Sequence, residues 1–478
     1  MTNHRSKAHL ALCLWLALGA SAAHGQTPAA TSPCPRAMSL DASAIEAEAV
    51  CLLRQYVQID TTNPPGNELA TARFLQSFLS REGIAAQLFE SAPGRASLYA
   101  RLRGDGSRKA LMLVHHMDVV PANAEEWSTA PFGAELRDGY VWGRGTLDNK
   151  GPGIMEVLAV VMLKRLKVPL ARDVVLLAVA DEEQGGGKGA RYLMAEHFDQ
   201  FADIEFALNE GGAMVVLPDK PMLYAVEFAQ KVPLWLRLTA SGPAGHASMP
   251  KHEAAPHVLI RALARLEQYE FPVTVVPEVQ RVFSERAASM APDKRAAYQS
   301  LAKSLEEPAF RDEFLHDPHN ALMVRNSLAI TMLAGSPKEN VYPAHASAVL
   351  DLRLLPGQDP VQVIAELERV MHEPEIKVET LLSSTAHASP LDTTMFKAIE
   401  GLVQRHDAQA RVTASFISGF TDCNTFRAKG ITCYGFMPMR LPVAEFERVH
   451  GRDERIAVAD LSQATMLLNE LVRDVAGR

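Results

Sequence analysis

In the first half of the chain, short apolar runs of strand length alternate with longer stretches whose apolar residues recur at helical spacing. A first helix is expected over residues 45–59, and it ends before the Pro-Pro-Gly break. Because parallel strands need helical crossovers, the alternation predicts a largely parallel sheet with helices on both faces. The expected elements are strand 110–114, helix 154–166, strand 174–180, helix 188–197 and strand 206–208.

Polar residues gather where these apolar runs end. In open α/β sheets, ligands bind beyond the carboxyl ends of the strands. Acidic and imidazole side chains are therefore expected to meet at one edge of the sheet. They are His115, His116 and Asp118 after the first run, Asp181, Glu182 and Glu183 after the second, and Asn209 and Glu210 after the third.

The hydropathy pattern changes near residue 231. Residues 232–240 and 347–355 alternate apolar and polar positions like half-exposed strands, and a charged helical stretch lies between them. We interpret residues 232–382 as a smaller α+β insert. It divides a doubly wound α/β catalytic domain into residues 41–231 and 383–478.

The first 25 residues have the pattern of a secretory signal peptide. Basic residues precede an apolar run over residues 8–23, and small residues follow at the spacing of a cleavage site. The alternative, a membrane anchor, is disfavoured because a bilayer span needs roughly 20 apolar residues. Cys13 lies inside the run, which disfavours a lipoprotein. We expect a secreted or periplasmic protein with no membrane attachment after cleavage, opening on a linker over residues 26–40.

Composition narrows the class of protein. The chain has 478 residues, of which 47% are hydrophobic and 22% charged, with a formal charge of -8. These values are ordinary for a globular protein of two or three domains, and they exclude a small disulfide-stapled scaffold. The chain lacks the basic excess that a phosphate backbone attracts, so nucleic acid is not an expected partner.

Four cysteines remain after the predicted cleavage, an even number in an oxidising compartment. Cys34 and Cys51 are close in sequence, as are Cys423 and Cys433, and each pair is a candidate disulfide. Buried free thiols are the alternative. No CxxC or Cys/His cluster indicates a thiolate metal site.

Five short motifs carry the candidate chemistry. Each alone is weak, because a carboxylate at a strand end is more often a helix cap or a solvated loop residue. Together they bring three carboxylates and two imidazoles to one sheet edge, where a pair of divalent cations would satisfy them. The motifs are His116-Met117-Asp118, the segment Gly143–Gly151 with Asp148, Asp181-Glu182-Glu183, Asn209-Glu210-Gly211-Gly212 and Val449-His450-Gly451.

From about residue 45 to the C-terminus, these motifs resemble the co-catalytic zinc metallopeptidases in order and spacing. That family includes the aminoacylases, succinyl-diaminopimelate desuccinylase, the glutamate-releasing carboxypeptidases and the carboxypeptidase S branch. The resemblance implies two zinc ions per subunit, for which cobalt or manganese can substitute. It also implies that the insert is a lid through which the chain forms a homodimer.

The resemblance assigns the metal ligands. Asp148 would bridge the two ions, since its two oxygens can hold cations about 3.5 to 4 Å apart. His116 and Glu210 would complete one site, and Glu183 and His450 the other, leaving room for a bridging water. Asp118 is expected to accept the second imidazole N–H of His116. In this family the peptide bond after the bridging aspartate is commonly cis.

Glu182 is expected to act as the general base. It is next to a ligand without being one, and it can take a proton from the water and deliver it to the leaving nitrogen. The alternatives are that Glu182 is the ligand and Glu183 the base, or that Asp181 takes this role.

The insert and a late loop supply further candidates. The segment Gly245-His246-Ala247-Ser248-Met249-Pro250 resembles the family loop whose histidine stabilises the oxyanion in the neighbouring subunit. This makes His246 a catalytic residue acting in trans. Asn340, Arg353 and Thr421 resemble substrate contacts, although Arg353 could instead pair with Asp351.

Some features depart from the family pattern or imitate other sites. His115 replaces a usual glycine, and Asn209 stands where aspartate is frequent. The 94 positions between His246 and Asn340 are longer than in compact members and similar to the carboxypeptidase S-like branch, which puts the trans assignment in doubt. The glycine-rich segment 185–189 lacks the spacing of a phosphate loop, and no Gly-x-Ser-x-Gly elbow is present.

The resemblance implies an exported amidohydrolase that cleaves peptides or N-acyl amino acids next to a free C-terminal carboxylate. Glutamate at position 210 resembles the aminoacylase and carboxypeptidase branches, whereas aspartate is common in aminopeptidases. The alternatives are an aminopeptidase or dipeptidase of the same family and a non-catalytic scaffold with the same fold. The scaffold is disfavoured because all five ligands and the base are present.

Overall fold

The computed structural model describes residues 33–478 except 213, 216–221 and 288–289. The predicted signal peptide therefore lies outside the described residues. Over the described part, no helix is both long enough and apolar enough to cross a bilayer.

A ten-stranded mixed sheet organises the part of the chain that carries the motifs. Its main path runs β1-β2-β6-β3-β7-β17-β9-β8-β18, and β16 pairs with β9. Pairs β6–β3, β3–β7 and β7–β17 are parallel, as the βα alternation predicts. The strands are β1 (Ala86–Ala92), β2 (Arg95–Leu102), β3 (Ala110–His116), β6 (Val174–Val179), β7 (Ile204–Asn209), β8 (Met214–Val215), β9 (Leu223–Gln230), β16 (Arg411–Ile417), β17 (Thr432–Gly435) and β18 (Arg440–Leu441).

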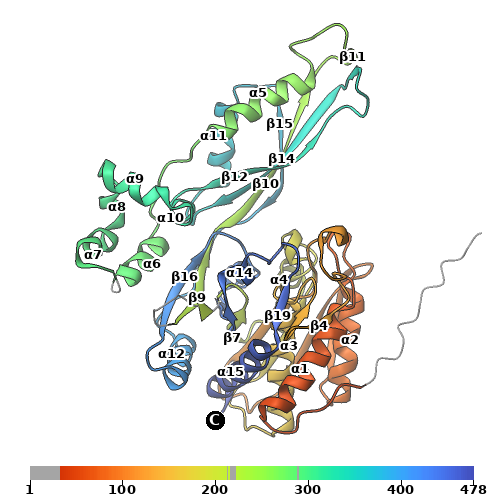
Figure 1. Cartoon of the computed structure of the whole chain (residues 1–478), viewed down its shortest axis with the longest axis vertical. Helices are drawn as coiled ribbons and strands as arrows, with labels where there is room; N and C mark the ends of the chain where they lie inside the picture. Colours follow the sequence, from red (N-terminus) through yellow and green to blue (C-terminus); the bar gives the residue numbers. More distant parts are fainter. Residues whose placement is uncertain (1–32, 213, 216–221, 288–289) are drawn as a thin grey trace, which may run out of the picture. The chain divides into compact units, whose positions relative to one another are not determined.

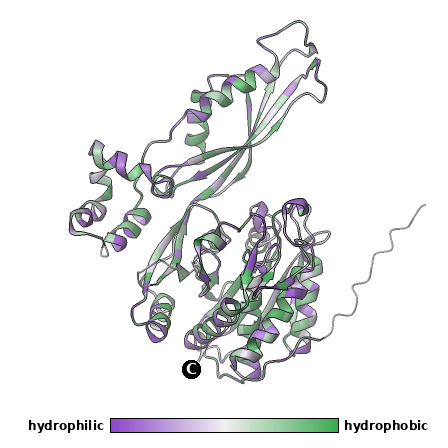
Figure 2. Cartoon of the chain, in the orientation of Figure 1, coloured by the Kyte–Doolittle hydropathy of each residue, from purple (hydrophilic) through white to green (hydrophobic). Residues whose placement is uncertain are grey.

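Helices cover both faces of this sheet (Figure 1). Alternate residues of β3 divide between two cores: Leu111 and Leu113 face the core of α1, α3 and α15, while Met112 and Val114 face the core of α4 and α13. Figure 2 shows hydrophobic and hydrophilic residues alternating along the covering helices. The helices are α1 (Ala42–Val57), α2 (Glu68–Arg81), α3 (Lys150–Arg165), α4 (Ala190–Glu196), α12 (Thr394–His406), α13 (Cys423–Arg427), α14 (Val443–Phe446) and α15 (Val458–Ala476).

Short strands and 3-10 helices complete the described part of the chain. A three-stranded sheet joins segments that are far apart in the sequence. It consists of β4 (Glu135–Arg137), β5 (Tyr140–Trp142) and β19 (Arg455–Ala457). Three short 3-10 helices also occur, η1 (Ala124–Glu126), η2 (Glu182–Gln184) and η3 (Phe198–Gln200).

The insert, residues 232–382, has a core of its own. Its four-stranded antiparallel sheet has the order β12-β14-β10-β15, and α5 packs against α11 beside it (Figure 1). Alternate residues of β10, including Leu234, Leu236 and Leu238, fill this second core. The elements are β10 (Val232–Ser241), β11 (Gly245–His246), α5 (Ala255–Glu267), β12 (Ser327–Ala334), β13 (Val341–Tyr342), β14 (His345–Leu354), α11 (Pro360–Met371) and β15 (Lys377–Ser383).

The charged helical stretch within the insert packs differently from its neighbours. Buried residues such as Val279, Phe283 and Phe314 belong to the core of the large sheet rather than to the core of the insert, and α6 packs against β16. The helices are α6 (Pro277–Ala287), α7 (Pro292–Gln299), α8 (Leu301–Ser304), α9 (Pro308–His316) and α10 (Pro318–Met323).

Both candidate disulfides are formed. Cys34 bonds Cys51, and Cys423 bonds Cys433. The second joins the start of α13 to β17.

Candidate active site

The motif residues meet at the carboxyl ends of neighbouring strands. His116 is the last residue of β3, the pair Glu182 and Glu183 opens η2 after β6, and Glu210 follows β7. Because β6, β3 and β7 are parallel neighbours, their ends deliver these side chains to one place. His450 reaches the same place from a loop near the C-terminus, with the backbone at a positive φ of 60°.

Asp148 lies between the two imidazoles. Its Oδ1 is 2.8 Å from Nε2 of His116, and its Oδ2 is 2.9 Å from Nε2 of His450. The peptide bond between Asp148 and Asn149 is cis, which confirms the expectation from the family resemblance. Each oxygen of one carboxylate therefore faces a different histidine.

Two sets of three potential metal ligands share this aspartate. Glu210 lies 3.5 Å from Nε2 of His116, and Glu183 lies 3.3 Å from Nε2 of His450. Within each set, one ligand atom from every residue lies within 4.8 Å of the others. The sets are His116, Asp148 and Glu210, and Asp148, Glu183 and His450.

This donor set fits two divalent cations. Imidazole nitrogen and carboxylate oxygen are both ligands that zinc accepts, and each set has three protein donors, as catalytic zinc sites do. The buried Oε1 of Glu183 meets His450 as an ion-pair contact at 3.3 Å and accepts no well-aligned hydrogen bond from the described residues. A cation would satisfy this oxygen.

Asp118 contacts His116 through its main-chain oxygen, whereas the sequence predicts a contact through its carboxylate. The Nδ1 atom of His116 lies 2.9 Å from the main-chain oxygen of Asp118, whereas the carboxylate is 3.6 Å away. That carboxylate instead accepts the backbone N–H groups of Glu182 and Glu183, both at 3.1 Å, and the side-chain amide of Asn63. Asp118 thus fixes both the histidine ring and the turn that carries the two glutamates.

Without cations, protons balance the charges of the site. The carboxylates of Asp148 and Glu183 beside its Nε2 raise the pKa of His450 to about 10. Burial raises the pKa of Glu183 to about 7. Burial alone would lower the pKa of His116, but the nearby Glu210, Asp118 and Asp148 raise it well above its usual value. The cluster therefore holds protons that cations would displace.

Glu182 is buried beside the ligand sets but belongs to neither. Burial raises its pKa well above the usual range, and the nearby carboxylates of Glu210, Glu183 and Asp422 act in the same direction. Its Oε1 has no hydrogen-bond partner among the described residues. A carboxyl group with a raised pKa and a free oxygen is suited to accept and release a proton.

Glu454 is a supporting residue that the sequence analysis missed. It is fully buried, and its Oε1 accepts the backbone N–H groups of Leu147 and Asp148 at 2.7 and 3.0 Å. Its Oε2 accepts from Arg144 at 2.7 Å, and Arg144 donates to the carbonyl of Gly451. One carboxylate therefore fixes the Asp148 loop and, through Arg144, the His450 loop. In the sequence, the signal that could have identified Glu454 is its place four positions after the ligand His450.

The unusual His115 has a structural explanation. Its ring lies between Glu156, 2.9 Å from Nδ1, and the hydroxyl of Tyr56, 3.1 Å from Nε2. A Cβ atom on Gly153 would come within 2.4 Å of this ring. The glycine in α3 therefore makes room for the histidine.

His246 and Asn340 lie side by side but are not brought into the cluster. β11 pairs with β13, and the backbone N–H of Ala247 donates to the carbonyl of Asn340. His246 is exposed, and its Nδ1 accepts from the backbone N–H of Ser248. In the described chain, these contacts stay within the insert.

The other two predicted substrate contacts have partners within the chain. Arg353 forms a two-bonded ion pair with Asp351, the alternative raised by the sequence, at 2.7 Å for each bond. The hydroxyl of Thr421 donates to Gln230 and accepts from the backbone N–H of Cys423.

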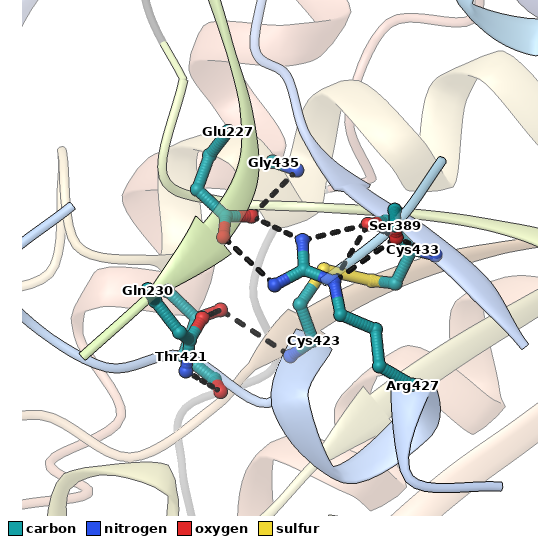
Figure 3. Close-up of a disulfide and its surroundings, with 8 residues drawn as sticks. All are labelled: Glu227, Gln230, Ser389, Thr421, Cys423, Arg427, Cys433 and Gly435. Atoms are coloured by element: carbon teal, nitrogen blue, oxygen red, sulfur yellow. Dashed lines mark hydrogen bonds and ion pairs between the residues drawn. A yellow bond between two sulfur atoms is a disulfide. The ribbon is translucent and has the colours of Figure 1, made fainter. Parts of the chain in front are cut away.

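Figure 3 shows how the segment after Thr421 is anchored. Arg427 of α13 makes a buried, two-bonded ion pair with Glu227 of β9, at 2.8 and 2.7 Å. It also donates to the carbonyl of Cys433, whose sulfur is bonded to Cys423. β9 leads directly into β10, so this network ties the loop before α13 to the strand that enters the insert.

Comparison with known proteins identifies the family to which the chain belongs. Residues 112–474 match the peptidase family M20/M25/M40, and the chain belongs to this family. It is a metallo-amidohydrolase of the carboxypeptidase and aminoacylase type.

The relatives include both carboxypeptidase-like proteins and aminoacylases. The chain is 27% identical over 382 residues to a probable carboxypeptidase S-like 2 of Dictyostelium discoideum, covering 77% of this chain and 72% of the relative. It is 28% identical over 446 residues to aminoacylase-1 of Sus scrofa, covering 90% and 96%. The fold is similar to that of the M20 metallo-carboxypeptidase Sso-CP2 of Sulfolobus solfataricus, with a TM-score of 0.69, 20% identity and coverage of 89% and 98%.

Proposed function

We propose that the chain is an exported di-zinc amidohydrolase that cleaves a peptide or N-acyl amino acid next to a free C-terminal carboxylate. The observation that carries the proposal is Asp148, whose two oxygens lie 2.8 and 2.9 Å from two histidines, each with its own glutamate. Cobalt or manganese would substitute for zinc.

The ligand residues would hold the cations, with Asp148 shared between them. When bound, two divalent cations supply Lewis-acid activation of water and of the amide carbonyl. Asp118 and Glu454 keep the ligands in place through their buried hydrogen bonds. Binding therefore needs little rearrangement of the chain.

Glu182 would move the proton. It takes the proton from the attacking water and delivers it to the amide nitrogen as the C–N bond breaks, because without that proton the nitrogen would have to leave as a strongly basic anion. Its burial keeps bulk water from competing for that proton. Exchanging the roles of Glu182 and Glu183 is disfavoured, since Glu183 lies 3.3 Å from His450.

A homodimer formed through the insert would complete the site. β12 lies at an edge of the four-stranded sheet, and its Met332 and Leu333 side chains are 64% and 69% exposed. An apolar edge strand is suited to pairing with a second copy. His246 of one copy would then stabilise the oxyanion in the site of the other. The test is the mass of the purified chain in solution.

Export is supported by the two disulfides, which fit an oxidising compartment. The test is fractionation of cells that express the full chain, with N-terminal sequencing of the mature protein. Cleavage after residue 25 supports export, and an intact protein in the cytosol contradicts it.

The activity is tested by hydrolysis of a matched panel after chelation and metal return. The panel contains an N-acetyl amino acid, an N-blocked dipeptide, their C-terminal amides and a dipeptide with a free N-terminus. We expect zinc to restore hydrolysis of the two acids and not of the amides, since amidation removes the carboxylate. Cleavage only of the free-amine dipeptide would indicate the aminopeptidase or dipeptidase alternative, and no metal-dependent hydrolysis the scaffold.

A further inference from the structure

Trp235 lies on the face of the insert sheet that is opposite to its core. Its neighbours Leu234 and Leu236 are buried in that core, so its indole points the other way. The strand register pairs Trp235 with Asp351 of β14 and with Leu382 of β15, which places these side chains on the same face.

Two contacts link this face to the turn that carries Glu182. First, Leu382 packs against Gly185, the residue that ends η2, since a Cβ atom on Gly185 would lie 2.5 Å from its Cδ2. Second, the ring of Trp235 lies 6.3 Å from the ring of Phe420, two residues before Asp422. Asp422 lies beside the same turn, because a Cβ atom on Gly186 would come 3.0 Å from its Oδ1, so both contacts lead to the segment that follows Glu182.

The indole N–H is a donor without an acceptor. Nε1 of Trp235 is buried and has no hydrogen-bond partner among the described residues. Leaving such a donor unpaired is costly, and most buried donors in native proteins are paired. A ligand that brings an oxygen to this position would remove the cost.

The charges around the indole favour an anionic oxygen. The guanidinium of Arg353 lies 4.8 Å above the ring of Phe420 and is paired with Asp351. The buried Lys231 adds a second cation, and Arg353 is near enough to contribute, after burial, to lowering its pKa to about 8. Two cations therefore border this face, Arg353, which is paired with Asp351, and Lys231, whose Nζ donates to the carbonyl of Arg325.

We propose that Trp235 is a substrate-binding residue, whose indole N–H donates to the substrate's terminal carboxylate while its ring and that of Phe420 contact the adjoining apolar side chain. This rests on the proposed function and refines it. The favoured substrates are peptides or N-acyl amino acids whose C-terminal residue is large and apolar. Trp235 provides the hydrogen bond, and Phe420 provides most of the selectivity for side-chain size.

The test separates binding from chemistry. Trp235→Phe removes the N–H and keeps a ring, so KM for an N-acetylated phenylalanine should rise about tenfold, with kcat nearly unchanged. Phe420→Ala should lower the preference for phenylalanine over alanine by roughly tenfold. The matched control is Tyr269→Phe, which removes an aromatic donor that bonds Glu366 within the insert and should change neither quantity.

A binding measurement keeps this inference separate from the proposed function. Calorimetry with zinc-loaded Glu182→Gln protein and the same substrate should give a Kd about tenfold weaker when Trp235→Phe is added. An equal Kd, or an equal loss in the Tyr269→Phe protein, overturns the role of Trp235. If wild-type protein hydrolyses no substrate yet binds it in this Trp235-dependent way, the proposed function fails while the subsite stands.

Discussion

The metal-ligand edge of the large sheet and the β11–β13 pair of the insert carry two halves of the proposed chemistry, and they differ in what fixes their side chains. At the sheet edge, Asp118 and Glu454 hold the ligand loops through buried hydrogen bonds. In the insert, the ring of His246 is exposed and accepts a hydrogen bond from the backbone N–H of Ser248 in its own loop. The first half is formed within one chain, whereas our proposal completes the second with a substrate and another copy.

The largest effect on turnover is expected from replacing Glu182, the proposed general base. Glu182→Gln removes the proton acceptor and keeps the shape, so kcat should fall by about 10² to 10⁴. Metal content, measured by atomic emission, should stay at the wild-type value because Glu182 is not a ligand. Full activity would remove Glu182 as the base, and a loss of metal would make it a ligand.

The trans assignment of His246 is tested by mixing. His246→Ala alone should lose about 10² to 10³ in kcat, the cost of one oxyanion donor. Mixed with Glu182→Ala protein under conditions that exchange subunits, activity should recover to roughly a quarter of wild type if copies pair at random in a twofold dimer. Mixtures that stay inactive, in a confirmed dimer, would place the whole site within one chain.

Replacing Glu454, which fixes the ligand loops, should weaken zinc binding although Glu454 is not itself a ligand. In Glu454→Gln, an amide N–H₂ would face backbone donors or Arg144, so zinc affinity should fall by about 10 to 100-fold in a competition titration with a chelator. The matched control is Glu48→Gln, which alters a buried carboxylate that pairs with Arg165 instead. Equal affinities in both variants would contradict the role of Glu454.

The smallest effect is the pH dependence of the metal-free chain. Folding raises the pKa of Glu183 to about 7 and of Asp422 to about 8, mainly by burial, so the folded state holds protons that the unfolded state releases. Burial lowers the pKa of His115 to about 3, which acts in the opposite sense, but the two carboxyls outweigh it over this range. Stability should therefore fall as pH rises from about 5 to about 8, lowering Tm by a few degrees. Zinc should reverse much of this loss by replacing the protons. Tm that rises with pH in chelator would contradict this account.

The sequence predicts the metal-ligand edge well because strand order and motif order determine which side chains meet there. The family resemblance assigns His116 and Glu210 to one ligand set, Glu183 and His450 to the other and Asp148 to both, and the structure brings these sets together. The resemblance identifies Asp118 as a supporting residue but does not identify Glu454. Glu454 lies in a run of charged residues, and its burial depends on the fold of a loop joined to Gly143–Gly151.

The insert is less predictable for a different reason. The alternating pattern locates β10 and β14, and helical spacing locates the stretch 277–320, but neither says which core a helix joins. Phe283 and Phe314 pack into the core of the large sheet. Similarly, Arg353 lies two residues after Asp351 on one strand face, and only the structure decides that they pair.

The central claim is most directly tested by titrating the metal-free protein with zinc while following bound metal and hydrolysis together. We predict two zinc ions per chain, with full turnover only when both sites are filled. In Asp148→Ala protein, binding at both sites should weaken together, since one carboxylate serves both histidines. Full turnover with a single ion, or an Asp148→Ala protein that still binds two ions tightly, would contradict the shared site.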